Sequence, residues 1–365
     1  MKKLTIDKFF LSTTVILITV GFLVFLSASL GILAKNESKF YGVLFNQLVL
    51  GLGLGLLGLY ISSRINYKFW RKYSFWIFLS SIILTLLVFV PGLGFSHGGA
   101  KRWIEIGPLS FQPVEFLKFG FIIYFAAWLS SVRTKTQSFK WSILPFIILL
   151  GAIAFILFKQ PDTKSFILIL IAGISMIFIS GVPWKYIIGL ILGAVIGFAI
   201  LVSFKPYLLD RVETFLNPER DPQGSSYQLQ QSLIAIGSGG IFGRGFGQSV
   251  QKFSYLPEPQ GDSVFAVLGE EFGFIGGVTL ILLASAFALR GLRIGNNAPD
   301  LFARLLSVGI VILVIAQTFM NIASVTGVFP LTGVPLPFVS HGGTALMIDL
   351  IAVGIVFNIS RFQKS

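Results

Sequence analysis

The stretch FFLSTTVILITVGFLVFLSASLGIL, residues Phe9–Leu33, contains no charged side chain. Because a helix needs about 20 apolar residues to cross the hydrocarbon layer of a bilayer, this stretch predicts a membrane-spanning helix. Lys2 and Lys3 precede it, and the SAS sequence near its end imitates a signal-peptide cleavage site. The stretch is longer than the apolar region of a signal peptide, so we interpret it as an uncleaved first span.

Comparable apolar stretches recur along the whole chain of 365 residues. The composition is 55% hydrophobic and 15% aromatic with only 12% charged residues, and the mean hydropathy is +0.85, which excludes a soluble globular protein. The sequence therefore predicts an all-α integral membrane protein with ten transmembrane helices in a single domain, 1–365. The expected spans are Phe9–Leu33, Val43–Ser62, Ser74–Pro91, Pro113–Ser131, Ser142–Phe158, Ser165–Ser180, Tyr186–Ser203, Ser263–Leu289, Leu305–Ala323 and Gly343–Ile359.

The basic residues predict how the chain is oriented in the membrane. If the amino terminus is cytoplasmic, 16 of the 28 lysines and arginines fall in inner segments and six fall in short outer loops. Short cytoplasmic loops are enriched in these residues, so both termini are predicted to be inside. A long extracytoplasmic loop, 204–262, then joins the seventh and eighth helices, and two shorter outer connections cover 92–112 and 324–342.

The residue inventory excludes several kinds of chemistry. The chain has no cysteine, so it has no disulfide, thiolate nucleophile or Fe–S site. His97 and His341 are the only histidines, which excludes a multi-histidine metal site. An oxygen-ligated Mg²⁺ or Mn²⁺, held by carboxylates and a diphosphate, stays open as a cofactor. The net charge of +13 does not indicate a nucleic-acid partner, because the basic residues adjoin apolar helices and meet anionic membrane lipids there.

The long outer loop has two features of interest. Leu229, Leu233 and Ile236 recur at helical spacing, which predicts an amphipathic helix in the membrane interface. Such a helix either guides an amphiphilic substrate or only covers the helix ends. A dinucleotide site would need a strand before the segment GSGGIFGRGFG, 237–247, a helix after it and an acidic residue about 20 positions further on. Because the segment is also predicted to lie outside the cell, we reject a nucleotide site. The segment either offers backbone amides to a diphosphate or forms a flexible turn.

Asp262 stands in LPEPQGDSVFAVLGEE, 256–271, directly before the eighth predicted span. Two prolines and a glycine prevent an earlier helix start, so Asp262 is expected at or near the helix N-cap. Its carboxylate either caps the helix or carries chemistry, and the two roles are compatible. Glu270 and Glu271 follow about two turns deeper, where charged groups face the bundle interior as functional residues or in an internal salt bridge.

A second polar cluster precedes and enters the fourth predicted span. Glu115 and Lys118 are three residues apart on one helical face, a spacing that permits an ion pair. This pair either joins helices or lines a cavity. Lys101 and Arg102 adjoin Trp103 and either anchor the chain to phospholipid headgroups or bind substrate. Further ionisable groups near the outer side are those of KQPDTK, 159–164, which includes Asp162, and Asp349 in the last span.

Taken together, these segments resemble the SEDS family of polytopic cell-wall polymerases, to which FtsW, RodA and SpoVE belong. The resemblance covers nearly the full length. It is carried by GGAKRWIEIGPLSFQPVEFLK, KQPD, the long run from RVETFLNPERDPQGSSYQLQQ to YLPEPQGDSVFAVLGEEFG, and GVFPLTGVPLPFVSHGG. The segment QSVQKFSYLPE is more similar to the sequences of the FtsW branch than to those of the RodA branch. The chain departs from the family pattern at Thr163 and Lys164, where a leucine or phenylalanine and a glycine are usual, at His341, where tyrosine is common, and at Asp349.

The resemblance implies a ten-helix glycosyltransferase that polymerises lipid II into glycan strands outside the bacterial cytoplasmic membrane. It also implies that Asp262 is the essential acidic residue and that a class B penicillin-binding protein and other divisome or elongasome proteins are partners. The residues expected to bind substrate are Lys101, Arg102, Glu115, Lys118, Asp162, Arg211, Arg244, Glu270, Glu271 and Ser340.

The chemistry agrees with these residues. A sugar hydroxyl is a poor nucleophile at neutral pH, so one positioned carboxylate can act as its general base. The lipid diphosphate leaves as a stable anion, so one carboxylate with cations or a metal ion suffices and a paired general acid is not needed. Our hypothesis is that Asp262 deprotonates the acceptor GlcNAc hydroxyl, which attacks the MurNAc anomeric carbon with inversion.

Two other classes of function compete with this hypothesis. A lipid II flippase could line a transport path with the same acids and bases. A scaffold would only position other wall enzymes. The predicted position of Asp262 at the outer edge favours a polymerase, because a transport site is expected near the membrane midplane.

Overall fold

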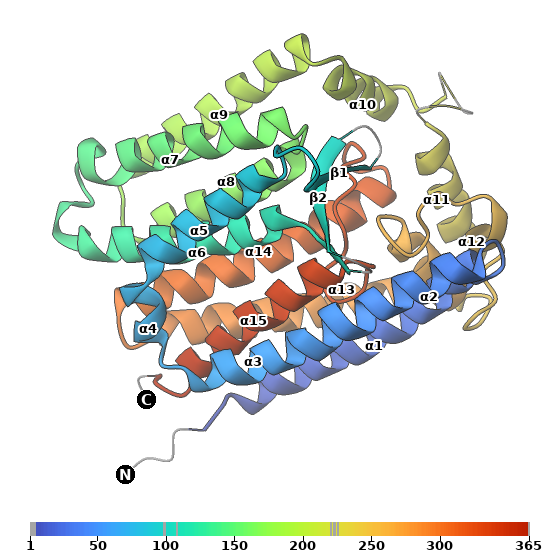
Figure 1. The fold of residues 1–365 in the computed structure, drawn as a ribbon, viewed down its shortest axis with the longest axis horizontal. Helices are drawn as coiled ribbons and strands as arrows, with labels where there is room; N and C mark the ends of the chain where they lie inside the picture. Colours follow the sequence, from blue (N-terminus) through green and yellow to red (C-terminus); the bar gives the residue numbers. More distant parts are fainter. Residues whose placement is uncertain are drawn as a thin grey trace.

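Long apolar helices make up most of the computed structural model (Figure 1), which describes residues 5–97, 100–106, 109–219, 221, 224 and 226–363. Within these ranges each of the ten predicted spans coincides with a helix. The helices are α1 (Lys8–Leu33), the continuous series α2 (Glu37–Asn46), π-helix η1 (Gln47–Leu54) and α3 (Gly55–Arg64), then α5 (Ser74–Leu87), α6 (Pro113–Ser131), α7 (Phe139–Lys159), α8 (Thr163–Ile179), α9 (Trp184–Phe204), α13 (Val264–Asn296), α14 (Leu301–Val325) and α15 (Gly343–Ser360).

Eight of these helical segments in the described ranges are long and apolar enough to cross a membrane. The other two, α5 and α8, are equally apolar but have only 14 and 17 residues. The prediction of a multi-pass helical membrane protein is therefore confirmed, and ten crossings remain a prediction. The tight hairpin predicted around 159–164 is present, because α7 ends at Lys159 and α8 begins at Thr163.

The connections are divided between the two ends of the bundle (Figure 1). At one end α1 begins and α15 ends, beside the short helix α4 (Tyr67–Lys72). At the opposite end lie a small sheet and the helices of the 204–262 segment. A short 3-10 helix, η2 (Arg133–Lys135), joins α6 to α7. Lys2, Lys3 and Lys364, which contribute to the predicted orientation, lie outside the described residues.

A three-stranded antiparallel sheet corrects the all-α prediction. It consists of β1 (Gly94–His97), β2 (Ala100–Ile106) and β3 (Leu109–Phe111), in that order. Ile104 in the central strand pairs with Gly94 on one side and with Phe111 on the other. The strands have only four, seven and three residues, much less than a hydropathy window long enough to find a span, so the sheet was not predicted.

The 204–262 segment is also more ordered than a loop. It contains α10 (Pro206–Leu216), α11 (Tyr227–Gly239) and α12 (Gln251–Ser254). A helix is present at the predicted place as α11, and its position in the membrane interface remains a prediction. Of the residues predicted to share its apolar face, Leu229 is buried, Ile236 is half-buried and Leu233 is exposed. The sequence analysis missed α10, although Pro206 suits the first turn of a helix.

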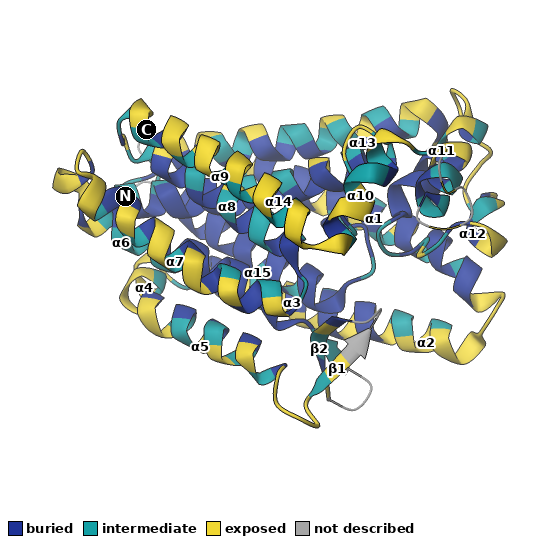
Figure 2. Cartoon of the chain, turned by 90° about the horizontal axis from the view of Figure 1, so that it is seen from above, coloured by how far each residue is buried: buried dark blue, intermediate teal, exposed yellow. Residues whose placement is uncertain are grey.

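The core lies around α14 and α15, which are buried along most of their length, whereas α9 is almost entirely exposed (Figure 2). Glycines bring α15 close to the helix that carries α3. A Cβ on Gly55 would lie 2.6 Å from Leu350 Cδ1, and one on Gly51 would lie 3.0 Å from Leu346 Cδ2. Small residues at such positions allow helix backbones to approach within a membrane.

Helix α13 is broken at Gly273, whose φ of +64° is outside the helical region. The glycine-rich segment 240–245 fills this break. Its Arg244 and Gly245 amides donate to the Glu270 and Glu271 carbonyls at 3.0 and 2.9 Å, and the Phe274 amide donates to the Gly240 carbonyl at 2.9 Å. The Arg244 and Gly245 amides therefore bind helix carbonyls and are not free to bind a diphosphate.

Candidate active site

Asp262 lies in a short loop that is held from behind by α14 and by the segment 333–342. The Asn321 side chain donates to the Asp262 carbonyl at 2.8 Å and to the Val334 carbonyl at 2.7 Å. Ser340 Oγ donates to the Gly261 carbonyl at 2.7 Å and accepts from the Leu336 amide at 2.8 Å. The backbone around Asp262 is thus fixed by two buried polar side chains. Ser340 acts on this loop instead of facing a substrate.

The Asp262 carboxylate does not cap α13. Ser263 is the N-cap residue, the helix begins at Val264, and no side chain caps it. Asp262 is half-buried, and its carboxylate forms no hydrogen bond with the residues that the structure describes. The capping interpretation is therefore wrong. What remains is a carboxylate with free lone pairs on a fixed backbone, which is the arrangement that a general base needs.

Gly333 lies between this carboxylate and the ammonium of Lys164. A Cβ on Gly333 would be 2.9 Å from Asp262 Oδ2 and 3.7 Å from Lys164 Nζ. Gly333 has a φ of +66°, a conformation that favours glycine. Lys164 Nζ donates to the Gly333 carbonyl. The acid and the lysine therefore occupy one small space, an arrangement that the sequence analysis did not predict.

Two arginines approach the same region from the sheet and from α10. Arg102 on β2 reaches the α7–α8 hairpin, where Nε donates to the Gln160 carbonyl at 2.9 Å and Nη2 donates to the Pro161 carbonyl. Arg211 on α10 donates from Nη1 to the Thr332 carbonyl at 3.1 Å, next to Gly333.

The electrostatics of Arg211 indicate which charges surround it. Loss of water around its guanidinium lowers the pKa of Arg211 from its ordinary value, and the positive charge of Arg102 lowers it further. Tyr207, Asp262 and Asp162 act in the opposite direction. These five groups come from β2, α10, the hairpin and the start of α13, so the fold brings distant sequence segments into one polar site.

Asp162 has a structural role within this group. It is fully buried at the N-cap of α8, where it accepts from the Ser165 amide at 3.3 Å and from Ser165 Oγ at 2.8 Å. The next residue, Thr163, shares a hydrogen bond of 2.5 Å with the Tyr207 hydroxyl of α10. Asp162 thus fixes the hairpin that carries Lys164. Lys101 is exposed on β2 and lies on the opposite face of the strand from Arg102.

The pair Glu115 and Lys118 lies deeper in the bundle. The two side chains are buried and form the predicted ion pair, with 2.7 Å between Oε2 and Nζ. Lys118 also donates to the Gln317 side-chain oxygen at 3.0 Å, and Gln317 Nε2 donates to the Pro335 carbonyl at 3.0 Å. The pair therefore joins helices and connects through Gln317 to the segment that holds Asp262.

Glu270, Glu271 and Arg244 form a separate polar cluster, in which the two glutamates bind the segment 249–252. Glu271 Oε1 lies 2.6 Å from Lys252 Nζ, and Ser27 Oγ donates to the same carboxylate. Glu270 accepts from Ser249 Oγ at 2.6 Å and from the Val250 amide at 3.0 Å. Arg244 Nε is 3.6 Å from Glu270 Oε1. The expected internal salt bridge is present, and all three predicted residues bind protein groups.

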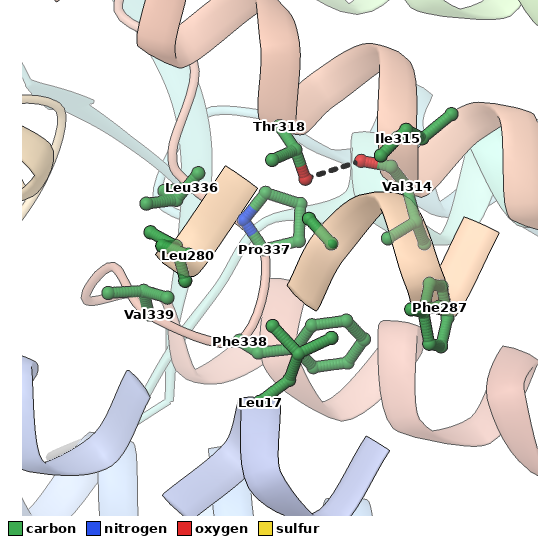
Figure 3. A pocket seen from close by; sticks show the side chains of 11 residues that line it. Leu17, Leu280, Phe287, Val314, Ile315, Thr318, Leu336, Pro337, Phe338 and Val339 are labelled. Carbon is green, nitrogen blue, oxygen red and sulfur yellow. Dashed lines mark hydrogen bonds between the residues drawn. The ribbon is translucent and has the colours of Figure 1, made fainter. Parts of the chain in front are cut away.

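The described polar residues around Asp262 form neither a metal site of their own nor the lining of the small cavity. The described residues contain no group of three His, Asp or Glu side chains that could hold a metal ion, and Asp162 is committed to its cap, so they do not fit a Mg²⁺ or Mn²⁺ site made by the protein alone. The small cavity in Figure 3 is apolar and is lined by Pro337 and Phe338, among others. Its other lining residues include Leu17, Leu280, Phe287, Val314 and Thr318.

The fold and the site define a class: a polytopic helical membrane protein with one free carboxylate beside several cations at the end of the bundle away from its termini. The model of the FtsW/RodA/SpoVE cell cycle proteins matches residues 8–365. The chain belongs to this family.

Relatives with known names agree along the full length. Stage V sporulation protein E of Bacillus subtilis (strain 168) is 38% identical over 365 residues, which are 100% of this chain and 99% of the relative. The probable peptidoglycan glycosyltransferase FtsW of Geobacter sp. (strain M18) is 38% identical and covers 98% of this chain and 97% of its own.

Solved structures share the fold. A chain of a peptidoglycan synthase complex, studied for the coordination of polymerization and crosslinking, is 28% identical with a TM-score of 0.79 and 98% coverage of both chains. The rod shape determining protein RodA of Thermus thermophilus is 25% identical with a TM-score of 0.70, covering 99% of this chain and 98% of its own. The predicted family membership is confirmed.

Proposed function

We propose that the protein is a peptidoglycan glycosyltransferase that polymerises lipid II into glycan strands on the outer face of the bacterial cytoplasmic membrane. Family membership and relatives named as probable peptidoglycan glycosyltransferases support this activity. The single observation that carries it is the free Asp262 carboxylate beside Lys164, Arg102 and Arg211. The whole chain, 1–365, acts as one membrane unit with the 204–262 segment over its outer end.

In this proposal both termini are cytoplasmic and the chain crosses the membrane ten times. The termini and α4 lie at one end of the bundle, and the sheet, α10 and α11 lie at the other, which supports the orientation predicted from basic residues (Figure 1). Asp262 then meets substrates at the outer water boundary, where undecaprenyl diphosphate carries the disaccharide-pentapeptide.

The reaction needs one proton acceptor and a stabilised leaving group. The Asp262 carboxylate takes the proton of the acceptor GlcNAc hydroxyl, whose oxygen attacks the MurNAc anomeric carbon with inversion. The bond between that carbon and the diphosphate oxygen breaks, and Arg102 and Arg211 stabilise the diphosphate anion as it leaves. Asn321 and Ser340 hold the base in position, because they bind the backbone on both sides of its Cα.

The other predicted substrate residues take supporting roles. Glu115 and Lys118 maintain the segment 333–342 through Gln317. Glu270, Glu271 and Arg244 fix the 240–252 segment in the break of α13. Lys101 faces phospholipid headgroups from the exposed face of β2.

The partner proposed for this polymerase is a class B penicillin-binding protein, which would crosslink the new strands in the divisome or elongasome. The structural relative belongs to a peptidoglycan synthase complex, which supports an assembly of this kind. The sequence relatives named FtsW and stage V sporulation protein E favour the FtsW branch.

Asp262→Asn tests the proposal with purified protein, its partner and lipid II. We expect polymer formation to fall about 100- to 10,000-fold, the range for loss of a general base, while the unfolding temperature is maintained. Asp210→Asn is the matched control, because Asp210 is an exposed aspartate of α10 in the same segment. It should keep native activity.

The same assay separates the rival functions. If native protein forms no polymer but moves lipid II across liposomes, it is a flippase. If it does neither and only raises the activity of a partner enzyme, it is a scaffold. Equal activity of the Asp262→Asn and native proteins would remove Asp262 from the mechanism.

A further inference from the structure

Lys164 occupies the site beside the reactive carboxylate, but the sequence analysis gave it no role. We propose that the Lys164 ammonium binds the diphosphate of the lipid substrate directly and supplies there the positive charge that a divalent cation would otherwise provide. This inference rests on the proposed function and deepens it, because it names how this chain holds the charged part of its substrate.

The geometry leaves the ammonium able to bind a ligand. Lys164 is half-buried in the first turn of α8 and uses one N–H donor on the Gly333 carbonyl. An ammonium has three donors, and no described residue accepts from the other two. Asp262 Oδ2 and Lys164 Nζ both lie within 4 Å of the Cβ position on Gly333, so the ammonium lies next to the base.

The surrounding charges favour an anion in this space. Arg102, Arg211 and Lys164 contribute three positive charges from three different elements. Asp262 is the acid that remains without a hydrogen bond here, because Asp162 is buried in its helix cap. A site with this excess of cations attracts a diphosphate and stabilises the charge that develops on it as the bond to the sugar breaks.

The position of the lysine is fixed. Asp162 caps α8, Thr163 hydrogen-bonds to Tyr207, and Arg102 binds the carbonyls of Gln160 and Pro161. The backbone before Lys164 therefore has contacts with β2 and α10. A preorganised ammonium loses less freedom on binding than a lysine on a mobile loop would, so it contributes more to affinity.

A lysine suits the donor set better than a metal ion does. A Mg²⁺ ion at a diphosphate is usually held by one or two carboxylates together with waters and the phosphates. Here Asp162 is bound in its helix cap, and Asp262, the acid without a hydrogen bond among the described residues, is the proposed base. An ammonium is a compact point charge that needs no carboxylate ligand. The expected consequence is that this protein binds a lipid diphosphate in the presence of a chelator.

Binding of undecaprenyl diphosphate to the purified full chain in detergent with EDTA tests the proposal. Lys164→Met keeps the length of the side chain and removes the charge, so its dissociation constant should rise about 10- to 100-fold. Lys164→Arg should lose less than Lys164→Met. Lys159→Met is the matched control, because Lys159 is an exposed lysine of the same hairpin, and it should bind as the native protein does.

Two further measurements decide the interpretation. Undecaprenol, which lacks the diphosphate, should bind equally to the native and Lys164→Met proteins. Added Mg²⁺ should restore part of the polymerisation lost in Lys164→Met and change the native rate little. Unchanged diphosphate binding by Lys164→Met overturns the proposal, and so does an equal loss of undecaprenol binding, because the lysine would then have only a structural role.

These outcomes separate the inference from the proposed function. If native protein makes no polymer with lipid II but binds undecaprenyl diphosphate through Lys164, the glycosyltransferase proposal fails and the lysine site stands. If polymer forms and Lys164→Met binds the diphosphate normally, the reverse holds.

Discussion

The Asp262 carboxylate is free because α13 begins two residues later, with Ser263 as its N-cap. A carboxylate at the cap would accept hydrogen bonds from helix amides. In Asp262 the group held by a side chain is instead the backbone carbonyl, which accepts from Asn321. The base is thus held through its main chain and its side chain is left for substrate. This separation explains how one residue can be both fixed and reactive.

Gly333→Ala tests whether this spacing matters. The new methyl group would lie 2.9 Å from Asp262 Oδ2, and the φ of +66° is costly for alanine. We expect the carboxylate to shift and polymerisation to fall about 100-fold, since displacement of a catalytic group by about 1 Å has that effect. Rates of lipid II polymerisation measure the change.

Gly327→Ala provides the control for backbone strain. Gly327 also has a positive φ, +74°, but a Cβ there meets its nearest neighbour, Leu229 Cδ1, at 3.6 Å, an ordinary contact. Both variants should lose similar stability, and only Gly333→Ala should lose activity. Equal activity in the two variants would mean that contact with Asp262 is unimportant.

At this scale, the sequence pointed to some site residues and not to others. Asp262 could be singled out because it lies between a proline-rich segment and an apolar helix, and its role as the essential acid was predicted from the family resemblance. Its neighbours Lys164 and Gly333 could not be predicted, because they are separated from it by long stretches of chain and only tertiary packing unites them. The one available signal for Lys164 was its departure from the family pattern.

Helix α13 shows how two acids in a predicted span are accommodated. Glu270 and Glu271 lie in the short part before Gly273, and their side chains bind the 249–252 segment, while their carbonyls bind the amides of 244–245. Lys252 and Glu271 are fully buried. A buried ion pair is worth little compared with apolar side chains, but loss of one partner leaves an uncompensated charge.

Lys252→Met should therefore destabilise the protein by about 3–5 kcal/mol, because the Glu271 carboxylate loses its cation in a buried site. The double variant Lys252→Met with Glu271→Gln should recover most of this loss, since glutamine still accepts from Ser27 and from the Ser249 amide. Thermal unfolding in detergent measures both. As a control, Arg244→Met should cost less than about 1 kcal/mol, because Arg244 is 42% exposed.

If the double variant is no more stable than Lys252→Met, the lysine contributes by packing and not by charge. The distinction matters for the break in α13. The amides of Arg244 and Gly245, which bind the Glu270 and Glu271 carbonyls, lie only a few residues before Lys252 in the chain.

Elements differed in how well the sequence predicted them. The spans were found because membrane helices need long apolar runs. The break at Gly273 was missed because hydropathy is unchanged across it, and the partners that satisfy the broken helix lie about 30 residues earlier. The sheet was missed because its strands are much shorter than a membrane span.

At the scale of the whole molecule, the two ends of the bundle differ: one holds the polar site around Asp262, and the other joins the first and last helices. Away from the site, Arg290 Nη2 binds Asp7 Oδ2 at 2.7 Å, and the Asp7 amide donates to Ser360 Oγ at 3.2 Å. These contacts join the start of α1 to α13 and to the end of α15. The termini are therefore tied to the bundle at the end opposite Asp262 (Figure 1).

Single cysteine variants test the orientation, because the chain has no cysteine of its own. Ser254 in α12 and Asn296 at the end of α13 are exposed near opposite ends of the bundle. In intact spheroplasts, a membrane-impermeant maleimide should label Ser254→Cys and leave Asn296→Cys unlabelled. Permeabilised cells, in which both should react, are the control. The opposite labelling pattern would put Asp262 on the cytoplasmic side.

The two shortest apolar helices border the polar site. Helix α5 has 14 residues and α8 has 17, so they are about 21 and 26 Å long against a hydrocarbon layer of about 30 Å. The end of α5 is bound to the turn between α7 and α8, where Gln160 Nε2 donates to the Thr85 carbonyl at 2.9 Å. If α5 and α8 cross the membrane as proposed, such hydrophobic mismatch thins the adjacent leaflet or makes flanking lysines snorkel. The phosphates of an isoprenoid lipid that arrives from this side would then lie closer to the depth of Lys164.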